Sequence, residues 1–175
     1  MCFRIGSDLI IRVYVDAAYG VHIHDGKSHS GAYTVLGAGG PLEAKSGKQK
    51  NVTKSSTEAE LVALSDHAGR GINLRNFLAG QRYGTVQVII YQDNMSCMAI
   101  TARGRPTSER SRHINIRYFW LCERMKLGEV VLVQRATTLM YANVLTKPLQ
   151  GKQFVTERNG ITNWSESRET AVEST

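Results

Sequence analysis

Alternating apolar residues near the start of the chain predict a β-strand. In residues 9–15, Ile11, Val13 and Val15 recur at every second position, the period of a strand that buries one face. The stretch VHIHDGKSH that follows is predicted to be a loop. Beyond it, SGAYTVLGAGGPLEAKSG contains two strand-like pieces around a Gly-Gly-Pro turn, which predicts a β-hairpin.

A helix is predicted after this hairpin, in SSTEAELVALSDHAGRGINLRNFLAG. Its apolar positions keep the spacing of one helical face: Leu61, Leu64, Ala68 and Ile72. Ser55 and Glu58 have the spacing of a capping box, although Thr57 and Glu60 offer a competing register. Gly69 and Gly71 weaken the middle of the segment and predict a kink or an early end.

The rest of the chain alternates between strand and helix patterns. VQVIIYQ and EVVLVQ predict strands, whereas NMSCMAITA, HINIRYFWLCERMKLG and TLMYANVLTKPL predict helices, the last of them stopped by Pro148. The resulting order is β, β, β, α, β, α, α, β, α. It predicts an α/β domain over residues 1–154 with helices packed on a mixed sheet. Residues 155–175 are polar and predict a largely disordered C-terminal tail.

Composition excludes several classes of protein. No apolar run reaches the length of a membrane span, and the N-terminal apolar stretch, broken by Arg12, resembles a strand rather than a secretion signal. Three widely spaced cysteines without a CxxC pair argue against a zinc knuckle or a disulfide framework. We therefore expect an intracellular protein, cytoplasmic or nuclear, kept in a reducing compartment.

The net charge of +7 favours an anionic partner. Basic residues crowd two segments, one with Lys45, Lys48, Lys50 and Lys54, the other with Arg103, Arg105, Arg110, Arg112 and Arg117. Two solvated faces and a phosphate-binding surface explain this pattern equally well.

Three acids occupy positions where a site could form. Asp16 and Asp93 each close an apolar strand, and sites in α/β sheets form at the carboxyl ends of strands. Glu60 lies in the first turns of the helix between them. Carboxylates brought together would repel one another unless a cation joined them, and Mg²⁺ prefers such oxygen ligands. The alternative is that the two aspartates cap strand ends and that Glu60 favours a helix N-terminus.

Several motifs resemble those of one family. SGAY, KSGKQKNVTKSSTEAELVALSDHA, YQDN, RHINIRY, GEVVL and ANVLTKPL occur in the order and spacing of the ribonuclease H domain of copia-type retrotransposon polyproteins. The resemblance implies a ribonuclease H-like fold, a five-stranded mixed sheet with helices on both faces. It also implies cleavage of the RNA strand of RNA–DNA hybrids by four acids that bind two Mg²⁺ ions, with Mn²⁺ as a possible substitute.

The resemblance assigns roles to individual residues. Asp16, Glu60 and Asp93 match three of the four metal-binding acids, and Asn143 stands at the position of the fourth. Ala18 also replaces a usual acid. The candidates for nucleic-acid contacts are Lys45, Lys48, Lys50, Arg110 and Arg112.

Three functional hypotheses follow. The first is an active metal-dependent endonuclease that acts on RNA–DNA hybrids. The second is a nucleic-acid-binding module whose metal site is impaired by Asn143, and the third is a domesticated scaffold that docks a protein. The family's integrase and polymerase segments are missing, so we expect either a polyprotein fragment, for which the polymerase part is a possible partner, or a separate gene.

Overall fold

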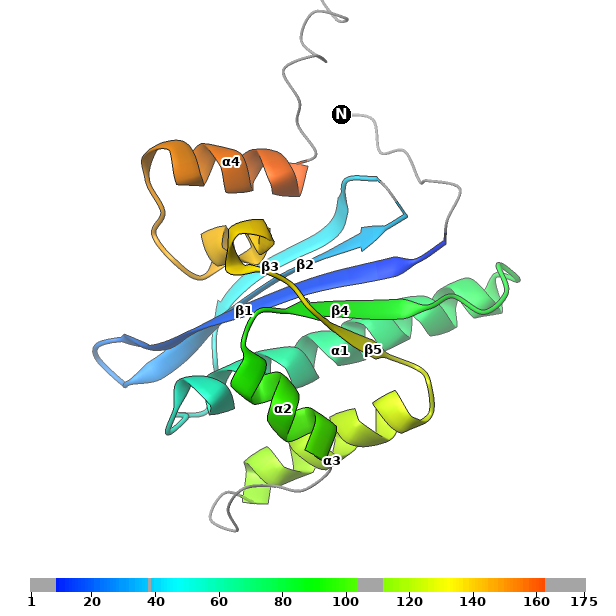
Figure 1. Cartoon of the computed structure of the whole chain (residues 1–175), viewed down its shortest axis with the longest axis horizontal. Helices are drawn as coiled ribbons and strands as arrows, with labels where there is room; N and C mark the ends of the chain where they lie inside the picture. Colours follow the sequence, from blue (N-terminus) through cyan, green and yellow to red (C-terminus); the bar gives the residue numbers. More distant parts are fainter. Residues whose placement is uncertain (1–8, 38, 104–111, 163–175) are drawn as a thin grey trace, which may run out of the picture.

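A computed structural model describes residues 9–37, 39–103 and 112–162 (Figure 1). The elements follow one another as β1 (Ile11–His22), β2 (Lys27–Leu36), β3 (Pro41–Lys48), α1 (Ser56–Gly80), β4 (Val88–Gln92), α2 (Met95–Arg103), α3 (Arg112–Lys126), β5 (Val131–Gln134), the 3₁₀ helices η1 (Thr137–Leu139) and η2 (Tyr141–Leu145), and α4 (Gly151–Thr162). The predicted order of strands and helices is confirmed through β5.

The strands form one mixed sheet in the order β3-β2-β1-β4-β5. The first three strands pair antiparallel, whereas β4 is parallel to both β1 and β5. The predicted hairpin around the Gly-Gly-Pro turn is the pair formed by β2 and β3. The parallel strands β1 and β4 therefore lie side by side in the sheet, and their pairing ends at Tyr14 and Tyr91, beyond which β1 continues to His22.

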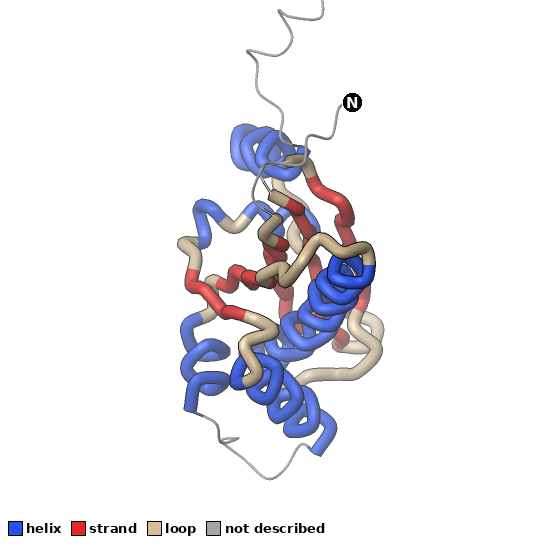
Figure 2. The backbone as a smooth tube through the Cα atoms, turned by 90° about the vertical axis from the view of Figure 1, so that its right-hand side faces the viewer, coloured by secondary structure: helices blue, strands red, loops and turns tan. Residues whose placement is uncertain are grey.

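Helices cover both faces of this sheet, as predicted (Figures 1 and 2). The alternation in β1 turns Ile11, Val13 and Val15 toward α1, and α2 and α3 add residues to the same apolar core. On the opposite face, Tyr14 and its neighbours pack against η2 and α4 in a smaller cluster. Alternate residues of β1 therefore belong to two different apolar cores, one on each face of the sheet.

Helix α1 begins in the Ser55 register rather than in the competing one. The Ser55 hydroxyl accepts a hydrogen bond from the Glu58 backbone N at 3.2 Å, and the Glu58 carboxylate accepts one from the Lys54 backbone N at 2.8 Å. Glu60 is consequently free to face the sheet. Helix α1 runs without a break to Gly80, so the alternative of an early end is wrong. Gly71 lets the helix lie close to the sheet, since a Cβ there would lie 2.9 Å from Cγ1 of Val88.

Two predictions about the first hairpin are wrong. Strand β1 runs past Asp16 to His22, and in VHIHDGKSH only residues 23–26 form a turn, while the residues on either side belong to two paired strands. The pairing of Ala17 with Ser30 and of Ala18 with His29 continues the sheet beyond the apolar run. Backbone hydrogen bonds hold these residues in the strand although their side chains are not strand-like.

The predictions for the C-terminal part also need correction. The segment TLMYANVLTKPL forms the short helices η1 and η2 instead of one helix. Residues 155–162 belong to α4, so the expected boundary after Phe154 falls inside a helix. Helix α4 approaches η2 so closely that the ring of Tyr141 occupies the space of a Cβ on Gly160. Residues 163–175 of the predicted tail lie outside the described residues.

Two further observations bear on the sequence predictions. Within the described ranges, no helix is both long enough and apolar enough to cross a membrane. Cys97 and Cys122 are buried and free.

Candidate active site

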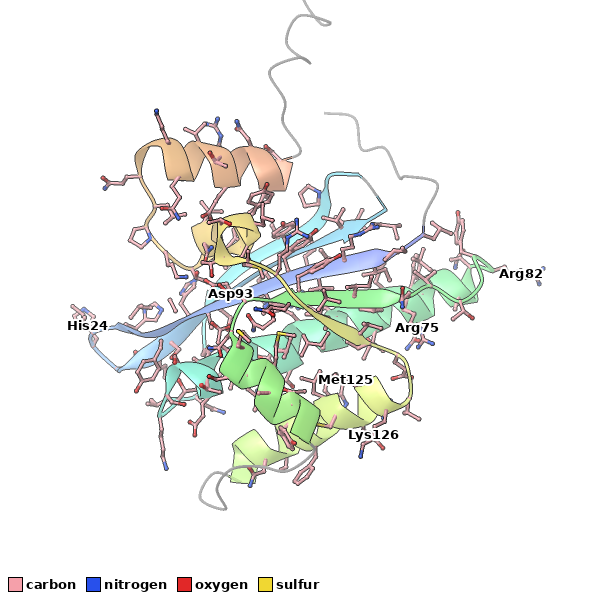
Figure 3. The ribbon with its side chains drawn as sticks, viewed as in Figure 1. His24, Arg75, Arg82, Asp93, Met125 and Lys126 are labelled. Atoms are coloured by element: carbon pink, nitrogen blue, oxygen red, sulfur yellow. The ribbon has the colours of Figure 1, made fainter. Side chains whose placement is uncertain are left out.

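The sheet brings Asp16 and Asp93 together. Strands β1 and β4 are parallel, and their register pairs Tyr14 with Tyr91. Asp16 and Asp93 each lie two residues beyond this pair, Asp16 within β1 and Asp93 directly after β4 (Figure 3). The adjacency expected of two parallel strands is therefore present.

Glu60 joins them from the first turns of α1. One carboxylate oxygen from each of Asp16, Glu60 and Asp93 lies within 4.8 Å of the others. Asp16 is 2% exposed and Glu60 5%, whereas Asp93 is half-buried. The three acids thus form a cluster that is buried at Asp16 and Glu60 and partly exposed at Asp93.

The electrostatics of the cluster are most evident at Glu60. Burial and, second to it, the Asp16 carboxylate raise the pKa of Glu60 to about 8, whereas a hydrogen bond from Gln92 acts in the opposite direction. The Gln92 Nε2 donates to the Glu60 carboxylate at 3.1 Å. A buried carboxyl with such a pKa gains from any cation that reaches it.

Polar side chains orient the two aspartates. The Thr137 hydroxyl donates to Asp93 Oδ2 at 2.9 Å, and the Thr146 hydroxyl donates to Asp16 Oδ2. Gln92 completes the support, because its Oε1 accepts from the backbone N of Asp93 at 2.9 Å. The carboxylates are therefore held by hydrogen-bond donors that leave oxygen lone pairs for another ligand.

A lysine lies beside Asp16. The Nζ of Lys147 is 3.3 Å from Oδ2 and 3.4 Å from Oδ1 of Asp16. The same Nζ donates to Asn143 Oδ1 at 2.7 Å. Asp16 therefore has an ammonium partner, and neither Glu60 nor Asp93 has an ion pair among those found in the described part of the chain.

Asn143, at the position of the fourth acid, is 2% exposed. Its amide nitrogen donates to the backbone oxygens of Met140 and Thr137, at 2.7 and 3.2 Å, and its amide oxygen faces Lys147. Asn143 thus lies next to the cluster through Lys147, and its amide also braces the turn between η1 and η2.

The three carboxylates fit a divalent cation of the hard type. Mg²⁺ and Mn²⁺ take oxygen ligands, and two or three carboxylates at this separation could bind one ion together with water or phosphate. Asp16, Glu60 and Asp93 would be the protein ligands. Such an ion would relieve the mutual repulsion that raises the pKa of Glu60.

The predicted nucleic-acid contacts that the structure describes belong to two elements, the region of β3 and the start of α3. Lys45, Lys48 and Lys50 are exposed on or after edge strand β3. Lys45 lies close enough to His67 of α1 to lower its pKa, whereas Lys48 pairs with Asp25 at 2.9 Å. Arg110 lies outside the described residues, and Arg112 is the first residue of α3.

The sequence prediction missed four residues of the site: Gln92, Thr137, Thr146 and Lys147. Thr146 and Lys147 belong to the motif LTKPL, which begins two residues after the position of the fourth acid, so their proximity could have been inferred. Thr137 carries no comparable signal, because its contact with Asp93 depends on the turn that forms η1.

Comparisons with curated proteins relate the chain to the Pol polyproteins of plant transposons. The chain is 30% identical over 154 residues, 88% of its length, to the retrovirus-related Pol polyprotein from transposon TNT 1-94 of Nicotiana tabacum. It is 31% identical over 151 residues, 85% of its length, to that from transposon RE1 of Arabidopsis thaliana. The chain spans about a tenth of these relatives, 11% and 10% of their lengths. No model of a known protein family matches the chain.

Solved structures share the fold at low identity. LC11-RNase H1, isolated from compost by a metagenomic approach, superposes with a TM-score of 0.60 at 16% identity, over 78% of this chain and 92% of that one. The same protein in complex with an RNA/DNA hybrid gives a TM-score of 0.54 at 16% identity, over 77% of this chain and 92% of that one. At such identities the likeness concerns the fold.

Proposed function

Because the chain has the ribonuclease H fold and is homologous to part of the Pol polyproteins of transposons, we propose that it hydrolyses the RNA strand of RNA–DNA hybrids with a bound divalent cation. Fold and relatives together support a function of ribonuclease H type, and the predicted resemblance to copia-type elements is confirmed. We propose in addition that the reaction depends on a metal ion and that the substrate is an RNA–DNA hybrid.

One observation carries the proposal. Asp16, Glu60 and Asp93 converge within 4.8 Å just beyond the point where the parallel pairing of β1 and β4 ends. Buried carboxylates that lie this close are costly unless they bind a proton or a cation. A strand-capping role explains neither the burial of Asp16 nor its convergence with a helix residue 44 positions away in sequence.

The residues of the site have separate tasks in this reaction. Bound Mg²⁺ would activate a water and neutralise charge on the leaving 3′ oxygen. Asp16, Glu60 and Asp93 would hold it, while hydrogen bonds from Thr146, Gln92 and Thr137 fix the rotamers of these acids. The water oxygen forms a bond to phosphorus as the bond to the 3′ oxygen breaks, which leaves a 5′ phosphate and a 3′ hydroxyl.

The substrate assignment is carried by the relatives and by charge. A hybrid places phosphates on both strands and a 2′-hydroxyl on one, and the 2′-hydroxyl distinguishes RNA from DNA. Lys45, Lys48 and Lys50 supply exposed positive charge on β3, and LC11-RNase H1, of the same fold, has been solved with an RNA/DNA hybrid.

The test is cleavage of a labelled RNA–DNA hybrid in Mg²⁺ by the wild type and by Asp93→Asn. We expect the variant to lose at least about 100-fold in rate, because a metal ligand is lost at an open position that tolerates asparagine sterically. Asp66→Asn is the matched control: Asp66 is an exposed acid of α1 that pairs with Arg117. Equal rates for the wild type and Asp93→Asn would overturn the proposal.

Asn143 favours a second candidate, a binding module without turnover. Where the resemblance implies a fourth acid, the amide oxygen of Asn143 accepts a hydrogen bond from Lys147. This candidate predicts hybrid binding without cleavage, even in excess Mn²⁺, and gain of cleavage in Asn143→Asp. The hybrid assay that includes this variant separates the two candidates.

A further inference from the structure

We propose that the ammonium of Lys147 takes the place of a second metal ion, so that the site binds one divalent cation per chain. The inference deepens the proposed function, since it concerns the same three carboxylates. It replaces the two Mg²⁺ ions that the family resemblance implies.

The geometry around Lys147 is that of a cation site. Its Nζ contacts three oxygens of two side chains: Asp16 Oδ2 at 3.3 Å, Asp16 Oδ1 at 3.4 Å and Asn143 Oδ1 at 2.7 Å. The resemblance assigns Asp16 to the acids that bind the two ions, and Asn143 holds the position of the fourth acid. The ammonium therefore lies between the two residues that a second ion would have to share.

The contacts of Asn143 fix this arrangement. Its amide nitrogen is already used by the backbone oxygens of Met140 and Thr137. The amide oxygen must therefore point the other way, toward Lys147. An asparagine oriented in this manner suits an ammonium donor, whereas it brings no negative charge to hold a divalent ion.

Charge balance leads to the same conclusion. With Asp16, Glu60 and Asp93 ionised, the cluster carries three negative charges, and Lys147 reduces the net charge to −2. One divalent cation neutralises this group completely. A second ion would create excess positive charge beside Lys147 in a buried site, which is electrostatically unfavourable. Four carboxylates without the lysine contact would balance two ions.

Metal stoichiometry tests the inference without any nucleic acid. We would titrate the purified chain with Mn²⁺ and measure the free ion by electron paramagnetic resonance. The wild type should bind one Mn²⁺. Lys147→Met should bind this ion about tenfold more tightly, because the ammonium no longer competes for Asp16. The double variant Asn143→Asp, Lys147→Met should bind two ions.

Two controls separate charge from structure. Lys147→Arg keeps the positive charge and should retain one ion, and Lys126→Met removes a lysine at the distant end of α3 (Figure 3) and should behave as the wild type. Circular dichroism checks that each variant is folded. If Lys147→Met destabilised the fold, the wild-type stoichiometry and Lys147→Arg would still decide the question.

The outcomes also separate this inference from the proposed function. A wild type that binds two ions and cleaves hybrid would overturn the role of Lys147 and leave the nuclease intact. A wild type that binds one ion but does not cleave hybrid would support the role of Lys147 and overturn the proposed nuclease function. Equal affinity in the wild type and Lys147→Met would overturn the inference, and a wild type that binds no Mn²⁺ would overturn both proposals.

Discussion

Asp16 and Gly31 are paired across β1 and β2, and the lack of a side chain at Gly31 leaves room for Leu145 and Thr146 next to Asp16. A Cβ on Gly31 would lie 2.6 Å from Cγ2 of Thr146 and 2.8 Å from Cβ of Leu145. The Thr146 hydroxyl, which donates to Asp16, therefore depends on a glycine in the neighbouring strand.

The first prediction concerns Gly31→Ala. The added methyl group should push the segment around Thr146 away from the sheet and lower the free energy of unfolding by about 1–3 kcal/mol, the usual cost of overpacking. Urea unfolding measures this change. Gly47→Ala is the matched control, since a Cβ there meets no heavy atom within 4 Å, and we expect a change within about 0.5 kcal/mol. Equal stabilities of the two variants would refute the steric argument.

The second prediction concerns the metal-free stability of Glu60→Gln. The pKa of Glu60 in the fold, about 8, lies above its usual 4.5, so its contribution to stability is fully present below pH 4.5 and is lost as the pH rises toward 8. Glutamine cannot ionise. The variant should therefore melt at nearly the wild-type temperature at pH 4.5 and several degrees higher at pH 8.

Divalent cation should reverse this difference, because an ion that binds only the folded wild type stabilises it. Thermal melts with and without Mg²⁺ at both pH values provide the measurement. Identical melting temperatures of the two metal-free proteins at pH 8 would show that burial and Asp16 do not destabilise the ionised form of Glu60.

The third prediction concerns Gln92, which is fully buried. Gln92→Leu removes the donor to Glu60 and leaves the backbone N of Asp93 without its acceptor. We expect a loss of about 1–3 kcal/mol in the free energy of unfolding. Since the hydrogen bond from Gln92 lowers the pKa of Glu60, its loss should also weaken Mn²⁺ binding at pH 7. Gln134→Leu, opposite Gln92 on β5, is the control and should leave Mn²⁺ affinity unchanged.

The sequence predicted the centre of the site because a simple rule applies there. Two apolar runs that end in acids are neighbours at one edge if their strands are parallel and adjacent, and β1 and β4 are. The choice of Glu60 over Glu58 needed the resemblance, since the capping pattern alone allowed both. The structure gives Glu58 the cap and leaves Glu60 for the cluster.

Apart from the motif LTKPL, which could have indicated Thr146 and Lys147, the rest of the site had no signal in local patterns. Lys147 lies 131 positions from Asp16 in sequence, and their contact depends on the 3₁₀ turns that replace the predicted helix. Helix α4 was missed because its sequence is largely polar and its helical position depends on the contact between Gly160 and Tyr141. Irregular segments have no periodic pattern in the sequence, so the contacts that they make cannot be predicted from periodicity.

The fourth prediction concerns Arg135, which connects the tyrosine stack of the sheet to the turn that carries Thr137. The rings of Tyr14 and Tyr91 are stacked at 4.7 Å, and the Arg135 guanidinium lies 5.3 and 5.0 Å from their centroids. Its Nε also donates to the backbone oxygen of Leu139 at 3.1 Å. Arg135 thus anchors η1 to β1 and β4.

Arg135→Met should lower the free energy of unfolding by about 1–2 kcal/mol, since it removes two cation–π contacts and one hydrogen bond. Mn²⁺ affinity should fall severalfold, because a looser η1 no longer holds the Thr137 hydroxyl on Asp93. Arg158→Met is the matched control: Arg158 lies 6.0 Å from the ring of Phe154 on α4. It should lose less stability and keep its metal affinity. If both variants bound Mn²⁺ as the wild type does, the turn would hold Asp93 without Arg135.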